Sequence, residues 1–136
     1  MPAAYLLDTN IASYLVRGNF PEVRKRIIRT PVESLAVSAV TEAELRYWVL
    51  CRPNSPRTRV GVADFLARVP SLPWDSGAAN VTARTRDHLK RQGRVLSTAD
   101  LMIAAHALSL DLTLVTHDQA FGFVYGLKTE DWTIES

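Results

Sequence analysis

The sequence predicts an α/β fold, a three-layer α/β/α sandwich around a mainly parallel central sheet. Short apolar runs of strand length, at 4–7, 35–37 and 112–115, alternate with stretches of helical length and pattern. Strands that alternate with helices pair in parallel through right-handed crossovers, with helices on both faces of the sheet. The length of 136 residues and the apolar fraction of 47% fit one domain, residues 1–136, with a packed core.

The first half of the chain predicts two strands and four helices. Residues 4–8 form a buried strand, and Asn10 then offers a helix N-cap before the helix ends at Gly18. Pro21 suits the first turn of the next helix, and Thr30-Pro31 ends it. After these come a strand at 35–37, a helix at about 41–51, a turn at 53–56 and a helix to about Arg68.

The second half predicts further alternation. Residues 98–109 are apolar and rich in alanine on most faces, which indicates a buried helix, and 112–115 is the pattern of a central strand. Gly93 closes the preceding helix, since glycine favours the left-handed conformation that follows a helix end. The remaining elements are a short strand at 71–74, a helix at 76–92 and, after a loop with Gly122 and Gly126, an edge strand at 132–134.

Composition argues against several classes of protein. No run of about 18 apolar residues occurs, which argues against a membrane span, and the first residues lack the basic start of a secretory signal. Cys51 is the only cysteine, which excludes an internal disulfide and fits a reducing compartment. We expect it to be a small buried residue. We therefore expect a cytoplasmic protein without membrane contact.

The basic residues are unevenly distributed, although the net charge is only +2. They concentrate in residues 17–29 and 84–94. A basic surface around an acidic cleft suits a polyanionic ligand. Charge alone also fits two solvated helix faces, and this alternative stays open.

Four carboxylates stand where an α/β chain brings residues together. Asp8 ends the first strand, and Glu44 lies after the second. Asp100 opens a buried helix, and Asp118 follows the strand at 112–115. Loops at the carboxyl ends of parallel strands line a shared crevice in which ligands bind. These four acids are therefore the candidate catalytic and metal-binding residues.

Each acid also has a structural alternative. Glu44 and Asp100 each stand three residues after a Thr or Ser, which is the spacing of a helix capping box. Asp8 fits a helix N-cap, and Asp118 fits an Asx-turn. For any single acid, the structural and the functional interpretations are equally supported.

Taken together, the acids favour a metal site. Apolar neighbours predict that Asp8 and Asp100 are buried, and no Lys or Arg stands in 5–10 or 96–111. Two carboxylates about 5 Å apart repel by roughly 3 kcal/mol at an effective dielectric near 20, against about 1 kcal/mol from a helix cap. Either the acids keep protons or a divalent cation lies among them. Oxygen ligands without Cys or paired His favour Mg²⁺ or Mn²⁺ over Zn²⁺.

Four motifs follow one another along the chain: LLDTN at 6–10, AELRY at 43–47, ADLMIAA at 99–105 and LTLVTHD at 112–118. This ordered set resembles the PIN-domain proteins, and most closely the VapC-type toxins of bacterial toxin–antitoxin pairs. The tail GLKTEDW at 126–132 also resembles VapC endings. The similarity spans essentially the whole chain.

The resemblance implies a Mg²⁺- or Mn²⁺-dependent endoribonuclease toxin that hydrolyses tRNA or rRNA loops with metal-activated water and is inhibited by a VapB-type antitoxin. It implies a metal-binding core of Asp8, Glu44 and Asp100, with Asp118 as the fourth acid. It also implies self-association, as a homodimer or a larger toxin–antitoxin assembly. The polar residues expected to support the acids are Thr9, Asn10 and Thr116.

Two residues depart from the pattern of this family. Trp48 stands where many relatives have Gly, and His117 stands where Arg or Asn is frequent. For His117, an exposed loop residue without a role is the simpler interpretation, and contact with a phosphate or a base is the other. The candidates for RNA backbone contacts are Arg17, Arg24, Lys25, Arg84, Arg86 and Arg91.

Two other functions stay open at this point. A phosphatase of the haloacid-dehalogenase type also begins with a strand that ends in Asp, but its chemistry needs a second Asp where this chain has Asn10. A non-catalytic module that binds RNA or protein would use the same acids as structural caps. The response to Mg²⁺ and the effect of Glu44→Gln on binding distinguish these functions.

Overall fold

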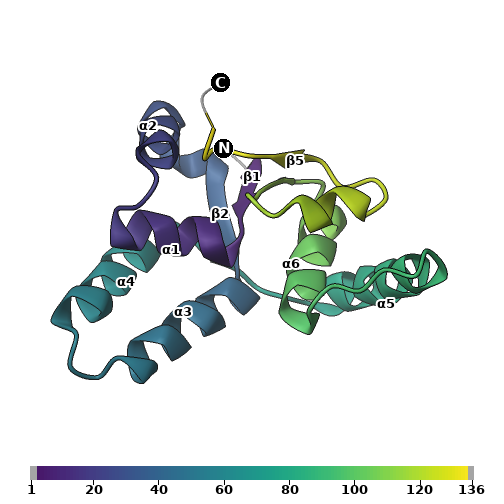
Figure 1. Ribbon diagram of the computed structural model, residues 1–136, viewed down its shortest axis with the longest axis horizontal. Coiled ribbons are helices and arrows are strands. Elements are labelled where there is room, and N and C mark those ends of the chain that lie inside the picture. Colours follow the sequence, from purple (N-terminus) through teal and green to yellow (C-terminus); the bar gives the residue numbers. More distant parts are fainter. Residues whose placement is uncertain (1–2, 135–136) are drawn as a thin grey trace.

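A parallel sheet with the strand order β3-β2-β1-β4-β5 forms the centre of the fold (Figure 1). The computed structural model describes residues 3–134. Every strand pair in this range is parallel, which confirms the predicted fold class. The strands are β1 Tyr5–Leu7, β2 Leu35–Ser38, β3 Ser71–Leu72, β4 Thr113–Val115 and β5 Thr129–Glu130.

Helices cover both faces of the sheet. The helices α1 to α4 contribute to one buried cluster, and α5 and α6 contribute to the other. The order of elements within the described residues agrees with the alternation that the sequence predicts. The α-helices are α1 Thr9–Arg17, α2 Pro21–Arg29, α3 Ala39–Cys51, α4 Pro56–Arg68, α5 Ser76–Arg91 and α6 Thr98–Ser109.

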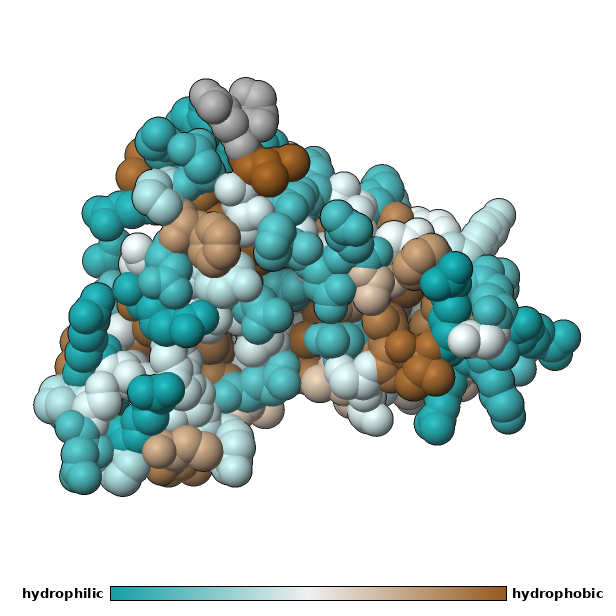
Figure 2. Space-filling model, in the orientation of Figure 1, coloured by the Kyte–Doolittle hydropathy of each residue, from teal (hydrophilic) through white to brown (hydrophobic). Residues whose placement is uncertain are grey.

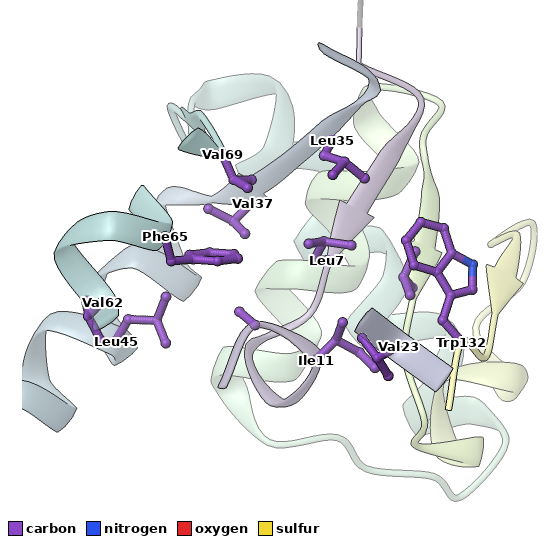
Figure 3. Packing of buried hydrophobic residues seen from close by; sticks show 12 residues of the cluster. Leu7, Ile11, Val23, Leu35, Val37, Leu45, Val62, Phe65, Val69 and Trp132 are labelled. Atoms are coloured by element: carbon purple, nitrogen blue, oxygen red, sulfur yellow. The ribbon is translucent and has the colours of Figure 1, made fainter. Parts of the chain in front are cut away.

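The central strand β1 divides the core between the two faces. Leu6 packs with the α5 and α6 cluster, whereas Leu7 packs on the other side, because consecutive strand side chains point to opposite faces. Figure 3 shows Leu7 between Phe65 and Trp132. Burying a leucine side chain contributes about 1.5–3 kcal/mol. The apolar strand therefore anchors its carboxyl end, where Asp8 follows, from both sides.

Several predicted boundaries differ from the structure, and β3 ends at Leu72 rather than at residue 74. Helix α3 begins at Ala39 rather than near residue 41, because Ser38 Oγ accepts a hydrogen bond from the Val40 N–H and forms the N-cap. The edge strand is Thr129–Glu130 rather than 132–134. Trp132 lies beyond it as a core residue, only 1% exposed, with its ring 5.0 Å from that of Tyr5.

Two further expectations, on Cys51 and on a membrane span, can be compared with the described residues. Cys51 is exposed at the end of α3, so the prediction of a buried residue is wrong. Among residues 3–134, no helix combines the length and apolar character needed to cross a membrane. Nδ1 of the buried His106 lies 2.8 Å from Ser38 Oγ, and burial lowers the pKa of the imidazole.

Helices α1 and α4 approach each other closely at Gly61. A Cβ atom built at this position would lie 2.9 Å from Val16 Cγ1 of α1. That separation is shorter than an ordinary contact between carbon atoms. The absence of a side chain at Gly61 therefore sets how near the two helices lie.

Candidate active site

Asp8 lies at the junction of β1 and α1, in the middle of the sheet. Its backbone N–H donates to the Val115 carbonyl at 3.0 Å, and its Oδ1 accepts from the Ile11 N–H at 2.8 Å. The side chain caps α1 and is only 3% exposed. Strand β1 has β2 on one side and β4 on the other. This is the reversal of strand order at which ligands bind in open α/β sheets.

Burial dominates the electrostatics of Asp8. Burial is the largest cause, and together with the charges of Asp100 and Asp118 it raises the pKa of this carboxyl group to about 6. Hydrogen bonds from the Thr116 side chain and the Ile11 N–H act in the opposite direction. Both neighbouring aspartates are therefore near enough to act on Asp8, although they are distant in the sequence.

Asp100 and Asp118 approach Asp8 from two other elements. Asp100 lies in the first turn of α6, where its N–H donates to Ser97 Oγ at 3.2 Å. Burial raises the pKa of Asp100, a hydrogen bond with Ser97 lowers it, and the charge of Asp118 raises it. Exposed Asp118 follows β4 and accepts from the Ala120 N–H at 2.9 Å. Both acids thus make the structural contacts that the sequence suggests, and the charge of Asp118 also acts on Asp100.

A threonine hydroxyl group links Glu44 to the residue that follows Asp8. Thr9 Oγ1 donates to Glu44 Oε1 at 2.5 Å and lies 3.0 Å from Thr41 Oγ1. Thr9 is the residue that follows Asp8. The capping-box interpretation of Glu44 is wrong, because the N-cap of α3 is Ser38 and Glu44 lies in the second turn.

The predicted supporting residues differ in their contacts. Thr9 binds Glu44, and Thr116 binds Asp8 while its Oγ1 also accepts from the Asp118 N–H at 3.0 Å. Asn10 is exposed, and within residues 3–134 its side chain makes no hydrogen bond. Sequence reasoning missed Thr41, whose burial inside α3 follows from the position of Ser38.

The chemistry of these groups fits a hard divalent cation. In the part of the chain that the structure describes, none of the four acids forms an ion pair with Lys, Arg or His. Their potential ligand atoms are all oxygens, which Mg²⁺ and Mn²⁺ prefer. Among the same residues, however, no three acidic, imidazole or thiol groups already lie close enough to hold a metal. The compact cage that the sequence predicts is therefore not preformed.

The predicted RNA contacts do not form one continuous strip. Arg24 and Lys25 lie on α2, packed on one face of the sheet, and the arginines of α5 lie on the other face (Figure 1). Lys25 pairs with Glu22 at 3.2 Å, and Arg91 pairs with Asp87 at 3.0 Å. The exposed residues predicted to contact RNA are Arg17, Arg24, Lys25, Arg84, Arg86 and Arg91.

His117 has defined partners. Its Nδ1 lies 2.9 Å from Asp131 Oδ2 and 2.9 Å from Thr133 Oγ1. Its ring lies 6.0 Å from that of Phe20. The imidazole is therefore oriented by side chains of the C-terminal segment, while about half of it stays exposed.

Residues 5–127 match the PIN domain family. The tRNA(fMet)-specific endonuclease VapC of Shigella flexneri is 35% identical over 130 residues, which cover 95% of this chain and 98% of that protein. The chain is a PIN-domain protein of the VapC family. Ribonuclease VapC2 of Haemophilus influenzae is 33% identical and covers 94% of this chain and 97% of its own length.

Solved structures of VapC-family proteins share this fold. VapBC2 from Rickettsia felis, bound to a DNA fragment from its promoter, has a TM-score of 0.88 at 25% identity, over 95% of this chain and 98% of that chain. VapBC-1 from nontypeable Haemophilus influenzae has a TM-score of 0.85 at 32% identity, over 96% and 99%. VapBC-5 of Mycobacterium tuberculosis, from a family of toxin–antitoxin systems, has a TM-score of 0.66 at 31% identity, over 96% and 98%.

Proposed function

We propose that this VapC-family protein is the endoribonuclease toxin of a toxin–antitoxin pair and that it depends on Mg²⁺ or Mn²⁺. It would hydrolyse phosphodiester bonds in RNA and leave 5′-phosphate and 3′-hydroxyl ends. Relatives that match nearly the whole chain are named as ribonucleases and as a tRNA(fMet)-specific endonuclease. Shared family membership supports the reaction type, and the acidic site supports the metal dependence.

One observation carries the metal dependence. Asp8 is buried, close to two further aspartates and without a cationic partner among the described residues. A buried carboxylate of this kind is costly unless it is protonated or paired with a cation. A divalent ion would provide that pairing, and the same acids would then serve catalysis.

Each acidic residue has a proposed role. Asp8, Glu44 and Asp100 would hold the metal ion, and Asp118 would add a fourth carboxylate from the loop that follows β4. A divalent ion held there supplies an acidified water nucleophile and offsets negative charge on the reacting phosphate. Thr9 would orient Glu44, and Thr116 would orient Asp8, through the hydrogen bonds described above. The two threonines would thus fix the orientation of the Glu44 and Asp8 carboxyl groups without adding charge to the site.

The proposed substrate is an RNA loop of tRNA or rRNA. Proteins read RNA sequence mainly in single-stranded loops, where unpaired bases are accessible. The predicted backbone contacts from α1, α2 and α5 would act through charge, so affinity would fall as salt concentration rises.

The proposed partner is a VapB-type antitoxin, with which the protein would form a homodimeric or larger assembly in the cytoplasm. Similar structures are VapBC complexes, and one belongs to a described family of toxin–antitoxin systems. Such an antitoxin would inhibit the toxin until it is released.

Cleavage of total RNA by the purified, antitoxin-free protein tests this proposal. We expect Mg²⁺-dependent cleavage at defined sites with 5′-phosphate ends, and its loss in Asp8→Asn. Asp64→Asn is the matched control, since Asp64 is exposed on α4 and, within residues 3–134, forms an ion pair with Arg68 alone. Cleavage that persists in Asp8→Asn, or in excess EDTA, would contradict the proposed site. Intact RNA together with unchanged RNA binding in Glu44→Gln would instead favour the non-catalytic module.

A further inference from the structure

A groove of about 470 Å³ lies where the end of α1 meets the connection between α3 and α4. Three arginines line it, each from a different place: Arg17 ends α1, Arg52 follows α3, and Arg57 begins α4. Its other lining residues are neutral: Val16, Asn19, Trp48, Ser55 and Thr58. The groove is therefore strongly positive, and none of the carboxylates in residues 3–134 lines it.

These three arginines differ from others on the surface. Arg46, Arg68 and Arg91 each pair with an acid four residues earlier on the same helix. Within residues 3–134, Arg17 and its two neighbours in the groove form no ion pair. Unpaired guanidinium groups that gather in one hollow repel one another, and an anion removes that repulsion.

Contacts within the protein hold two of the guanidinium groups in place. Arg57 Nη2 donates to the Arg17 carbonyl at 3.3 Å. The Arg17 guanidinium carbon lies 5.7 Å from the ring centre of Tyr14 and 5.9 Å from that of Trp48. Aromatic faces attract the cation without neutralising it. The charges are thus positioned and remain available to a ligand.

Helix α1 connects this groove to the acidic site. It begins directly after Asp8 and ends at Arg17, nine residues later. At 1.5 Å per residue, the groove lies roughly 13 Å from the acids along the helix axis. Figure 2 shows that the surface over α1, α3 and α4 is largely hydrophilic, whereas hydrophobic side chains gather between α6 and α5. A polyanion seated at the acids would reach the groove along this surface.

We propose that the groove of Arg17, Arg52 and Arg57 binds backbone phosphates of single-stranded RNA next to the cleavage site. Trp48 adds an aromatic face on which a base can stack, and this pairing of cations with an aromatic surface is typical of single-strand binding. The inference rests on the proposed ribonuclease function and adds a substrate contact to it.

Binding of a labelled single-stranded oligoribonucleotide, measured by fluorescence anisotropy in EDTA, tests the groove apart from cleavage. We compare Arg52→Gln/Arg57→Gln with Arg59→Gln/Arg68→Gln, which removes the same charge from exposed α4 positions outside the groove. The slope of log affinity against log salt is expected to fall by about 1.4 in the groove variant, since each single-strand phosphate contact contributes about 0.7. Trp48→Leu is expected to weaken binding without changing this slope.

The outcomes separate the groove from the nuclease. Equal losses of RNA affinity in the two double variants would contradict RNA binding in the groove. An unchanged slope of log affinity against log salt in the groove variant would contradict it as well. Weaker binding of the cognate antitoxin with unchanged RNA affinity also overturns it and assigns the groove to a protein partner. If wild type fails to cleave RNA but the groove variant still loses its salt-dependent affinity, the proposed function fails and the groove stands.

Discussion

Asp8 shows how one side chain can satisfy a structural rule and still be electrostatically costly. Its Oδ1 caps α1 through the Ile11 N–H, as capping residues do. Its burial and its two acidic neighbours nevertheless raise the pKa of the carboxyl group to about 6. The capping role therefore does not exclude a functional one, because each explains a different property of the residue.

Asp8→Asn is expected to raise the free energy of unfolding at pH 7, in metal-free buffer, by about 1–3 kcal/mol. The pKa of about 6 in the fold exceeds the ordinary 3.8, so the folded state binds the proton more tightly. The stability from this group is complete below pH 3.8 and is lost as the pH rises through 6, at about 1.4 kcal/mol per pKa unit. Asparagine avoids this loss and still accepts the Ile11 N–H.

Urea denaturation at pH 3.5 and pH 7 measures this effect. The gain should appear at pH 7 and vanish at pH 3.5, and added Mg²⁺ should stabilise wild type more than the variant. Asp64→Asn, at an exposed position, should show neither effect. An Asp8→Asn variant that is less stable than wild type at pH 7 would contradict the inferred cost of the charge.

The candidate acids could be predicted from the sequence, but their surroundings could not. Asp8 and Asp118 follow apolar strands, and that pattern is visible in the chain. The contact of Thr9 with Glu44 and Thr41 depends on how α1 packs against α3, over separations of more than 30 residues. The supporting role that the resemblance implies for Asn10 stays a prediction, because its side chain is exposed and makes no hydrogen bond within residues 3–134.

At the level of elements, helices were easier to predict than the strand at the sheet edge. Strand β5 has only two residues, one exposed and one partly buried, so it carries no apolar pattern. It forms because β4 offers a free edge, with the Leu114 N–H donating to Lys128 O at 2.8 Å and the Thr116 N–H to Glu130 O at 2.9 Å. Such pairing depends on tertiary structure. In the sequence alone, residues 132–134 have a stronger strand pattern than residues 129–130.

Trp132→Ala is expected to lower the free energy of unfolding by about 3–5 kcal/mol, the usual cost of deleting a buried large aromatic side chain. Trp132 packs on Tyr5, and its indole N–H donates to Glu130 Oε1 at 2.9 Å. The same Glu130 atom accepts from Arg26 at 3.1 Å, so Glu130 of β5 connects the indole to α2.

Denaturation of Trp132→Ala beside Ile134→Ala provides the comparison. Ile134 is 62% exposed two residues further along, so its truncation should change stability by less than about 0.5 kcal/mol. Similar losses in both variants would mean that the C-terminal segment, rather than the buried indole, accounts for the effect.

At the level of the whole molecule, the alternation of strands and helices predicted the layers but not the surfaces they create. Charge counting pointed to residues 17–29 and 84–94, which lie on α1, α2 and α5. The groove instead combines Arg17 with Arg52 and Arg57, which no run in the sequence connects. Only the packing of α1 against α4 brings them together, and periodicity says nothing about which ends of two helices will meet.

Gly61, where α1 and α4 approach each other, also determines how far apart the arginines of the groove lie. Gly61→Ala would push α4 away from Val16 and carry Arg57 from its place against the end of α1, while every charge in the molecule is kept. RNA affinity should therefore decline in this variant although its net charge is unchanged. Gly122→Ala, where a methyl group meets nothing within 4 Å, should bind as wild type does. Anisotropy titrations of the two variants would reveal whether spacing, and not only the number of arginines, governs how this surface holds an RNA strand.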